Sequence, residues 1–301
     1  MYVLGIDAGA TKTDCFLADK SGEILCRARG PGANLQICGE DEVESVLSSV
    51  IDEALSGRAA GADALCIGIA GADRPHETQV VQDILDRIGR ARSNLVTNDA
   101  VIALVAGAGE RYGVVLTVGT GATAYAINRA GKVARAGGWG YLFGDEGSAY
   151  WMGLRALRAV ARAADGRGRK TLLTSRVLDS LGLGSPESLI PRIYRQHARE
   201  EIARLARVVQ EAADLGDDAA QEILDEASRE LVHAAESVIG KLEMAGEPFH
   251  LVLAGGLWKA VPVLRDEVSR LLSMIAPRAV VQEPGVDAAV GAIQLALESL
   301  H

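Results

Sequence analysis

Asp7-Ala8-Gly9-Ala10-Thr11-Lys12-Thr13 and Val118-Gly119-Thr120-Gly121-Ala122-Thr123 are two short turns, each of which connects one apolar run to the next. Glycine lacks a Cβ atom, so backbone N–H groups at such turns can approach phosphate oxygens closely. Neither turn matches the P-loop or a complete G-x-G-x-x-G pattern, which disfavours the standard folds that carry those motifs. The two turns predict one phosphate-binding hairpin that occurs twice, with a nucleotide bound between two similar halves.

The secondary-structure pattern around the first turn repeats around the second. Three apolar runs predict an antiparallel meander: residues 2–7, 13–19 and 23–28. Helix and strand patterns then alternate, and the order restarts at residue 113. Gly119 precedes the turn glycine Gly131 by twelve positions, as Gly9 precedes Gly22 by thirteen. The repeat therefore predicts two α/β halves that arose by duplication.

The second half carries additional helices. Apolar stripes at helical spacing predict them at residues 150–164, 202–209 and 223–242, and the closing strands at 249–254 and 279–282. Asp165–Lys170 and Gly182–Pro186 are polar and turn-rich, so we expect them to form surface excursions rather than a linker between domains.

Composition limits the kinds of partner. The chain has 301 residues, 49% of them hydrophobic, and a formal charge of -9, which suggests two domains with substantial cores. Nucleic acids and anionic membranes need basic surfaces, so we expect neither as a partner. The N-terminus has no basic leader and no apolar run is long enough to span a bilayer, which predicts a soluble, cytoplasmic protein.

The cysteines predict no metal site. All four lie within the first 66 residues, and their spacing does not resemble a C-x-x-C site: Cys15, Cys26, Cys38 and Cys66. Their apolar neighbours indicate small buried hydrophobic side chains.

Two aspartates stand where chemistry is expected. Asp7 ends the first strand directly before the first turn and can hold Mg²⁺, usually through water, while turn amides and the Thr11 hydroxyl bind phosphates. The alternative is an aspartate that caps a tight turn. Asp99 follows a strand and begins a helix, where a carboxylate can accept a proton from a substrate hydroxyl. The alternative is a helix N-cap.

A glycine-rich stretch is the third candidate. Gly137–Trp151 concentrates glycines, aromatic residues and acids, a composition that can bring backbone donors, a carboxylate and a flat ring to a sugar. The alternative is a loop that leads into a helix whose N-terminus attracts Asp145 and Glu146. Asn34 can bond sugar hydroxyls or form a turn. Ala254–Lys259 follows a strand and can pack bare backbone against adenine or ribose, or simply turn into a helix.

Together these motifs resemble the acetate/sugar kinase, Hsp70 and actin superfamily and, more narrowly, the N-acetylglucosamine kinase family grouped with the BadF/BadG/BcrA/BcrD ATPases. The most specific match is Gly137-Gly138-Trp139-Gly140 followed by Gly144–Trp151. The resemblance implies an α/β fold of two ribonuclease H-like (actin-like ATPase) lobes with mixed five-stranded sheets and a cleft between them. It places one lobe at residues 1–109, completed by a helix at 286–301, and the other at 110–285.

The resemblance also implies an activity. It predicts transfer of the ATP γ-phosphoryl group to the 6-hydroxyl of N-acetylglucosamine or a close hexosamine, with Asp99 as catalytic base, Asp7 assisting Mg²⁺, and a homodimer. The implied sugar contacts are Asn34, Asp99, Gly138, Trp139 and Asp145. The implied nucleotide contacts are Gly9, Ala10, Thr11, Lys12, Gly119, Thr120, Gly121, Gly255, Gly256 and Lys259.

Two other functions fit the same resemblance. One is a BadF-type ATPase that activates a CoA-ester dehydratase through a cluster bridged by cysteines, which the absence of cysteines after residue 66 disfavours. The other is a catalytically silent sugar sensor, which the retention of Asp7 and Asp99 disfavours. Four positions depart from the family's pattern: Ala8, Ala10, Gln36 and Ala70.

Overall fold

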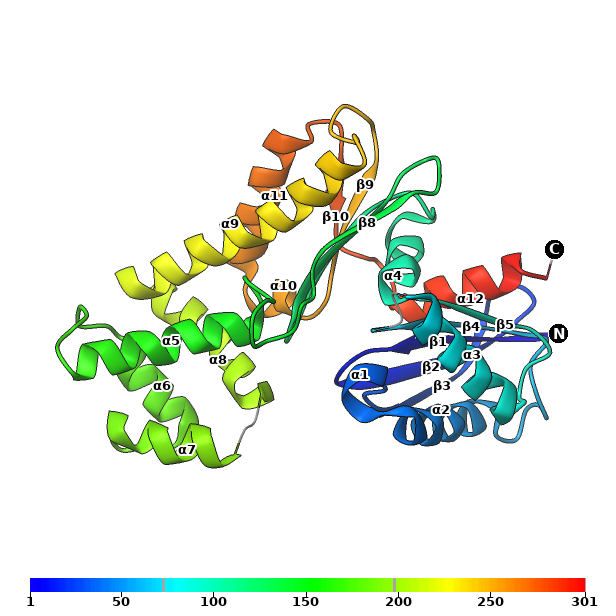
Figure 1. Ribbon diagram of the computed structural model, residues 1–301, viewed down its shortest axis with the longest axis horizontal. Helices are drawn as coiled ribbons and strands as arrows, with labels where there is room; N and C mark the ends of the chain where they lie inside the picture. Colours follow the sequence, from blue (N-terminus) through cyan, green and yellow to red (C-terminus); the bar gives the residue numbers. More distant parts are fainter. Residues whose placement is uncertain (72–73, 197–198, 301) are drawn as a thin grey trace. The chain divides into compact units, whose positions relative to one another are not determined.

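The computed structural model describes residues 1–71, 74–196 and 199–300 (Figure 1). Contacts divide the chain into two compact units, which we call unit 1 (Met1–Arg111 with Gln282–His301) and unit 2 (Tyr112–Val281). The sequence placed the boundaries after residues 109 and 285. Within the described residues, none of the helices is both long enough and apolar enough to cross a membrane.

Unit 1 is built on a five-stranded mixed sheet in the order β3-β2-β1-β4-β5. Its strands are β1 (Tyr2–Ala8), β2 (Lys12–Asp19), β3 (Ile24–Pro31), β4 (Ala64–Ile69) and β5 (Asn94–Asn98). The first three form the antiparallel meander that the sequence predicted, and β4 and β5 continue the sheet parallel to β1. Its helices are α1 (Leu35–Cys38), α2 (Glu40–Leu55), α3 (Pro75–Ile88), α4 (Asp99–Ala108) and α12 (Ala288–Glu298).

Side-chain alternation along β1 gives unit 1 a core on each face of the sheet. Leu4 and Ile6 are buried in the core that includes residues of α2 and α3. Val3 faces the other core, where α4 and α12 pack. Figure 1 shows α2 and α3 on one side of this sheet and α4 and α12 on the other. Gly5 allows α12 to approach, because a Cβ there would overlap the carbonyl oxygen of Ala289.

Unit 2 repeats this sheet. Its order is β10-β9-β6-β7-β8, so that in both units the first strand is central, the next two lie antiparallel on one side, and the last two lie on the other. The strands are β6 (Gly113–Val118), β7 (Ala122–Ile127), β8 (Val133–Gly137), β9 (His250–Ala254) and β10 (Val280–Gln282). The predicted fold class and the repeat are therefore confirmed.

Unit 2 carries the additional helices. They are α5 (Ala149–Ala164), α6 (Leu173–Leu181), a 3₁₀ turn at Pro186–Ser188, α7 (Leu189–Gln196), α8 (Arg199–Asp214), α9 (Asp218–Lys241), α10 (Leu257–Ala260) and α11 (Pro262–Ile275). Residues 165–170 form the expected exposed loop. Helix α6 was not predicted from the sequence; it is short, and its buried face includes Leu173, Val177 and Leu181.

The cysteines fit the expected role in part. Cys15 and Cys66 are buried, whereas Cys26 and Cys38 are only half-buried, and all four are free thiols. Burial raises the pKa of the Cys66 thiol to about 12, which makes this thiol unreactive. Among the described residues, no group of three or more histidines, cysteines or acidic residues is arranged to hold a metal ion.

Candidate functional site

Four carboxylates lie at one end of the unit 1 sheet. Asp7 and Asp14 are register partners on β1 and β2, so their side chains share one face of the sheet. Asp99 begins α4 and Asp287 stands directly before α12. Burial raises the pKa of Asp7 to about 7, and the charges of Asp99, Asp14 and Asp287 add to this effect against the opposing charge of Lys12. The charges of the other three acids therefore all act on Asp7.

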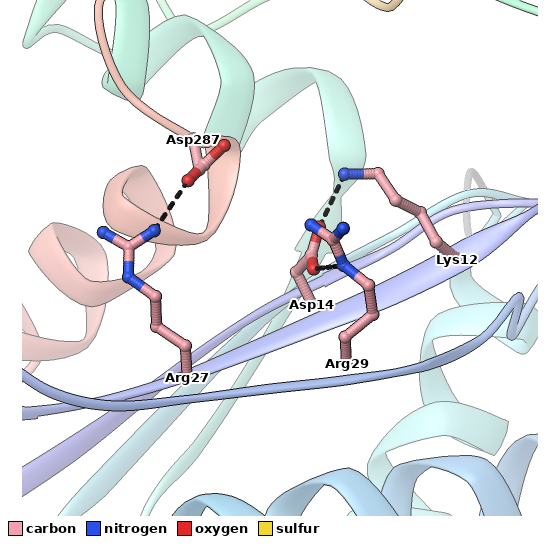
Figure 2. A network of polar contacts seen from close by, with 5 residues as sticks. All are labelled: Lys12, Asp14, Arg27, Arg29 and Asp287. Atoms are coloured by element: carbon pink, nitrogen blue, oxygen red, sulfur yellow. Dashed lines mark hydrogen bonds and ion pairs between the residues drawn. The ribbon is translucent and has the colours of Figure 1, made fainter.

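Asp14 gathers two cations around the first hairpin, as Figure 2 shows. Its carboxylate accepts from Lys12 Nζ at 2.6 Å and from Arg29 Nε at 2.6 Å. Asp14 is 3% exposed. Burial raises the pKa of its carboxyl, but the hydrogen bonds from Arg29 and Lys12 outweigh burial and hold the pKa below its ordinary value. An ionised, almost fully buried carboxylate thus holds Lys12, a predicted phosphate contact, in place.

Sequence reasoning missed Asp14 and Arg29. The available signal was an acid inside the apolar run that continues into Cys15, Phe16 and Leu17, where only a paired carboxylate is tolerated. A second pair missed by the sequence joins Arg27 Nη1 to Asp287 Oδ2 at 3.0 Å (Figure 2).

The first hairpin is held closed by its own backbone. Gly9 N donates to the Lys12 carbonyl at 3.0 Å, and Ala33 N donates to the Gly9 carbonyl at 3.0 Å. The second bond places the segment that begins α1, and with it Asn34, against the hairpin. Ala10 and Thr11 are exposed at its tip. The predicted nucleotide residues of unit 1 and Asn34 are thus brought together.

Asp99 is not the only acceptor at the start of α4. The N-cap is Asn98, whose side chain accepts from Ala100 N at 2.8 Å, and Asp99 Oδ1 accepts from the same N–H at 2.9 Å. Asp99 is half-buried at the carboxyl end of β5, and its charge helps to raise the pKa of Asp7. Because Asn98 provides the cap, capping alone does not account for Asp99. Its predicted role as base stays a prediction.

The second hairpin supports two other segments of unit 2. Gly119 N donates to the Gly121 carbonyl at 2.9 Å, and Ala149 N, at the start of α5, donates to the Gly119 carbonyl at 3.0 Å. Gly255 has φ 100°, and a Cβ there would overlap the carbonyl oxygen of Val118. The backbone after β9 therefore contacts the hairpin closely, as bare glycine allows.

The other predicted nucleotide residues lie on the same structure. Thr120 is half-buried at the tip of the second hairpin. Gly256 precedes α10, and Lys259 is exposed on that helix. The predicted nucleotide contacts of unit 2 thus lie on the second hairpin and on the segment that packs against it.

The glycine-rich loop folds back onto β7. Gly138 has φ 67° and donates to the Ala122 carbonyl at 2.8 Å, while Arg135 Nη2 donates to the Gly138 carbonyl at 2.6 Å. Trp139 is 65% exposed, and its ring centroid lies 6.5 Å from that of Phe143. The loop thus presents an indole that is not packed in the core of unit 2.

Asp145 braces this loop against the second hairpin. It is 6% exposed and has φ 58°, a strained conformation for a residue other than glycine. Burial raises its pKa, although its carboxylate accepts hydrogen bonds from the backbone of Ala122 and Gly140. A Cβ at Gly121 would lie 2.7 Å from Asp145 Oδ2. The carboxylate therefore has a structural role, and the predicted sugar contact stays a prediction.

The side chain of Gln36 lies outside the described residues. Of the other departures from the family's pattern, Ala8 is buried at the end of β1, and its carbonyl accepts from Ala70 N at 2.9 Å.

Comparison with known proteins relates the whole chain to one family. The model of the BadF/BadG/BcrA/BcrD ATPase family matches residues 4–296. A curated N-acetylmuramic acid/N-acetylglucosamine kinase of Clostridium acetobutylicum is 37% identical over 300 residues, 98% of each chain. A curated N-acetyl-D-glucosamine kinase of Dictyostelium discoideum is 33% identical over 311 residues, again 98% of each chain.

Solved structures share the fold. A crystal structure from Chromobacterium violaceum, provisionally assigned as an N-acetylglucosamine kinase, has a TM-score of 0.77 and 29% identity over 98% of both chains. A ROK family glucokinase from Streptomyces griseus, solved with glucose and AMPPNP, has a TM-score of 0.62 and 19% identity over 98% of both chains. The second likeness shows the fold alone.

Proposed function

This chain belongs to the BadF/BadG/BcrA/BcrD ATPase family, and we propose that it is an ATP-dependent amino-sugar kinase. The acceptor is the 6-hydroxyl of N-acetylglucosamine or a close hexosamine. The observation that carries this proposal is the likeness, over 98% of the chain, to two curated kinases at 37% and 33% identity.

Asp99 is the catalytic base in this proposal. It accepts the proton of the sugar hydroxyl as the hydroxyl oxygen attacks the γ-phosphorus and the bond to the β-phosphate oxygen breaks. Its half-buried position at the carboxyl end of β5 supports this role, since open α/β sheets bind ligands at that end. Phosphoryl transfer asks mainly for positioning and charge neutralisation, so one base suffices.

The acids of unit 1 suit Mg²⁺. Asp7 and Asp99 are close enough for the charge of one to raise the pKa of the other, and a bound cation would remove that repulsion. Mg²⁺ commonly takes one or two carboxylates together with substrate phosphates and waters, so a larger ligand set is not required. When bound, Mg²⁺ neutralises charge on the phosphates, and Asp7 would hold it.

Backbone groups and two lysines hold the nucleotide. In unit 1 the first hairpin offers amides, the Thr11 hydroxyl and Lys12, which Asp14 orients. In unit 2 the contacts are Gly119, Thr120, Gly121, Gly255, Gly256 and Lys259. The close approach of Gly255 to Val118 supports a shared backbone surface there.

The amino sugar contacts Asn34 of unit 1 and Gly138 and Trp139 of unit 2. The exposed indole of Trp139 supports a stacking role against the sugar ring. Asp145 acts first by fixing the loop that carries Trp139, and in the proposal it also bonds the sugar. In this proposal the protein acts in the cytoplasm, as its N-terminal sequence predicts, and forms a homodimer, as the family resemblance implies.

An assay of ATP consumption with a panel of sugars tests the function. N-acetylglucosamine, N-acetylmuramic acid, glucosamine and glucose are offered separately, and NMR identifies the phosphorylated position of any product. We expect sugar-dependent ADP formation with a 6-phosphorylated amino sugar. Hydrolysis of ATP that is indifferent to every sugar would contradict the proposal.

A further inference from the structure

A strongly basic segment lies in unit 2, outside the residues assigned to catalysis. Residues 155–170 contain six basic residues and one acidic residue, in a chain whose formal charge is -9. The basic residues are Arg155, Arg158, Arg162, Arg167, Arg169 and Lys170. Such a concentration of one sign runs against the charge of the rest of the chain.

The fold gathers five of these arginines around a cavity of about 550 Å³. Arg155, Arg158 and Arg162 recur at helical spacing on one face of α5. The following loop turns back over the end of that helix, because Gly168 N donates to the Arg162 carbonyl at 2.8 Å. This return brings Arg167 and Arg169 to the same cavity.

The far wall of the cavity is rigid. Thr171 Oγ1 donates to Asp217 Oδ1 at 2.8 Å and Leu172 N donates to Asp217 Oδ2 at 2.7 Å. Asp217 also caps α9 through Ala220 N at 2.9 Å. Its carboxylate accepts from the Thr171 hydroxyl and two backbone N–H groups, and within the described residues it forms no ion pair with these arginines.

The arginines are only partly neutralised. Arg155 pairs with Glu226, Arg167 with Asp165, and Arg169 with Glu222 and Asp218. These pairs are at least one-third exposed, and such pairs contribute roughly 1 kcal/mol or less, so an anion can compete for their guanidinium groups. Arg162 donates to the Arg167 carbonyl, and Arg158 has neither an ion pair nor a hydrogen bond within the described part of the chain.

An ordinary solvated helix face is the alternative, and the spacing argues against it. Arg158 and Arg162 stand four residues apart on α5, where like charges destabilise a helix. Arg162 gains from the negative end of the helix dipole, since it lies in the last turn, but Arg158 lies a turn earlier. A bound anion would offset the repulsion between them.

We propose that this cavity binds a small molecule that carries a phosphate or diphosphate group. Guanidinium groups bind phosphate oxygens with paired hydrogen bonds, and the cavity has the size of small-molecule sites. A ligand there would lie at the C-terminal end of α5. The other end of this helix begins at Ala149, whose N–H donates to the second hairpin. The inference does not depend on the proposed kinase activity.

Inorganic pyrophosphate is the probe, at constant ionic strength and without Mg²⁺. Calorimetry measures its dissociation constant, and hydrogen exchange of the amides in residues 162–171 reports where it binds. The test variant is Arg158→Gln with Arg162→Gln, and the matched control is Arg207→Gln, an exposed arginine on α8 outside the cavity lining. Thermal melting verifies that each variant is folded.

We expect pyrophosphate to slow exchange at residues 162–171 in the natural protein and in the Arg207 control. In the double variant this protection should disappear and the dissociation constant of that site should rise at least about tenfold. Pyrophosphate that leaves these amides unchanged in the natural protein, or that protects them equally in the folded double variant, would overturn the proposal. Sugar kinase activity, present or absent, leaves this result unaffected.

Discussion

The hairpin between β1 and β2 and the hairpin between β6 and β7 occupy equivalent places in two sheets of the same strand order, yet their chemistry differs. Across three neighbouring strands of unit 1, the paired residues are Asp7, Asp14 and Arg29. The equivalent row in unit 2 is Thr117, Thr123 and Gly137. One copy of the scaffold carries charge and the other carries none.

The difference separates two ways of binding phosphate. The unit 1 row holds a buried carboxylate that positions Lys12 and Arg29. The unit 2 row ends at Gly137, where the glycine-rich loop begins, so that the second hairpin offers backbone amides and this row carries no charged side chain. We infer that the first hairpin supplies acid and cations beside the base Asp99, whereas the second hairpin supplies backbone amides and no charged side chain. Substitutions in each hairpin and at Asp99 test this difference.

Asp99→Asn should have the largest effect. The amide keeps the shape of the side chain and cannot accept the proton, so turnover should fall about a thousandfold, within the usual range for a lost general base. Sugar binding should change little. Steady-state assays and calorimetry with N-acetylglucosamine measure the two quantities.

Asp179→Asn, at an exposed residue of α6, removes the same charge elsewhere and should behave as the natural protein does. Undiminished turnover in the Asp99 variant would show that Asp99 is not the catalytic base. The charged half of the comparison would then be structural only.

Asp7→Asn should abolish a pH dependence of stability that the equivalent row of unit 2 lacks, because the counterpart of Asp7 there is Thr117. The pKa of Asp7 is about 7 in the folded protein and about 3.9 in an unfolded chain. The folded state thus binds more protons between pH 4 and 7, so stability from this group falls as pH rises through that window. Between pH 5 and 8 the loss should reach about 2 to 3 kcal/mol, at 1.36 kcal/mol per pKa unit.

Urea unfolding at pH 5 and pH 8, with chelator and without nucleotide, measures this difference. The Asp7 variant should lose less stability than the natural protein over the same interval. Asp225→Asn, at an exposed residue of α9, serves as control and should follow the natural protein. Equal slopes for Asp7→Asn and the natural protein would show that Asp7 is already ionised at pH 5.

The sequence predicted the fold well because strand and helix periodicity is local. The meander, the repeated order and both hairpins could be read from short windows of apolar residues. Helix α6 was missed because its buried residues Leu173, Val177 and Leu181 span less than three turns and lie between polar, turn-rich segments. Its stability comes from packing, which a short window does not reveal.

The site was less predictable, because its contacts depend on register and on distant segments. Asp14 and Arg29 are fifteen residues apart in the chain and meet only through the pairing of β2 with β3. Arg27 and Asp287 are farther apart still, at 260 residues. Asp145 appeared as a ligand residue from its motif, and only the structure shows its bonds to Ala122 and Gly140.

Gly119→Ala tests the uncharged half of the comparison. No atom lies within 4 Å of the Cβ position at Gly119, so the substitution should leave stability unchanged. A methyl group there would keep a phosphate from the backbone amides. The loss of about 2 kcal/mol of binding free energy would raise the KM for ATP about thirtyfold. Initial rates at varied ATP measure the effect.

Gly184→Ala provides the matched control, because its Cβ would also meet open space. It should change neither KM nor the urea midpoint. An unaltered KM in the Gly119 variant, with both variants folded, would mean that the second hairpin does not approach the phosphates.

Asp14→Asn should have the smallest effect and tests whether charge in the first hairpin acts through position. The amide would no longer hold Lys12 and Arg29 as a buried anion does, so both cations would lose their fixed geometry. We expect the KM for ATP to rise about tenfold, roughly 1.4 kcal/mol, with a smaller change in kcat. Asp52→Asn, on α2, breaks an exposed ion pair with Arg90 and should alter neither constant. A merely structural role of Asp14 would lower the urea midpoint without changing KM and kcat to different extents. A variant that is less stable but binds ATP normally would therefore assign Asp14 to folding, and Lys12 would bind the phosphates without its help.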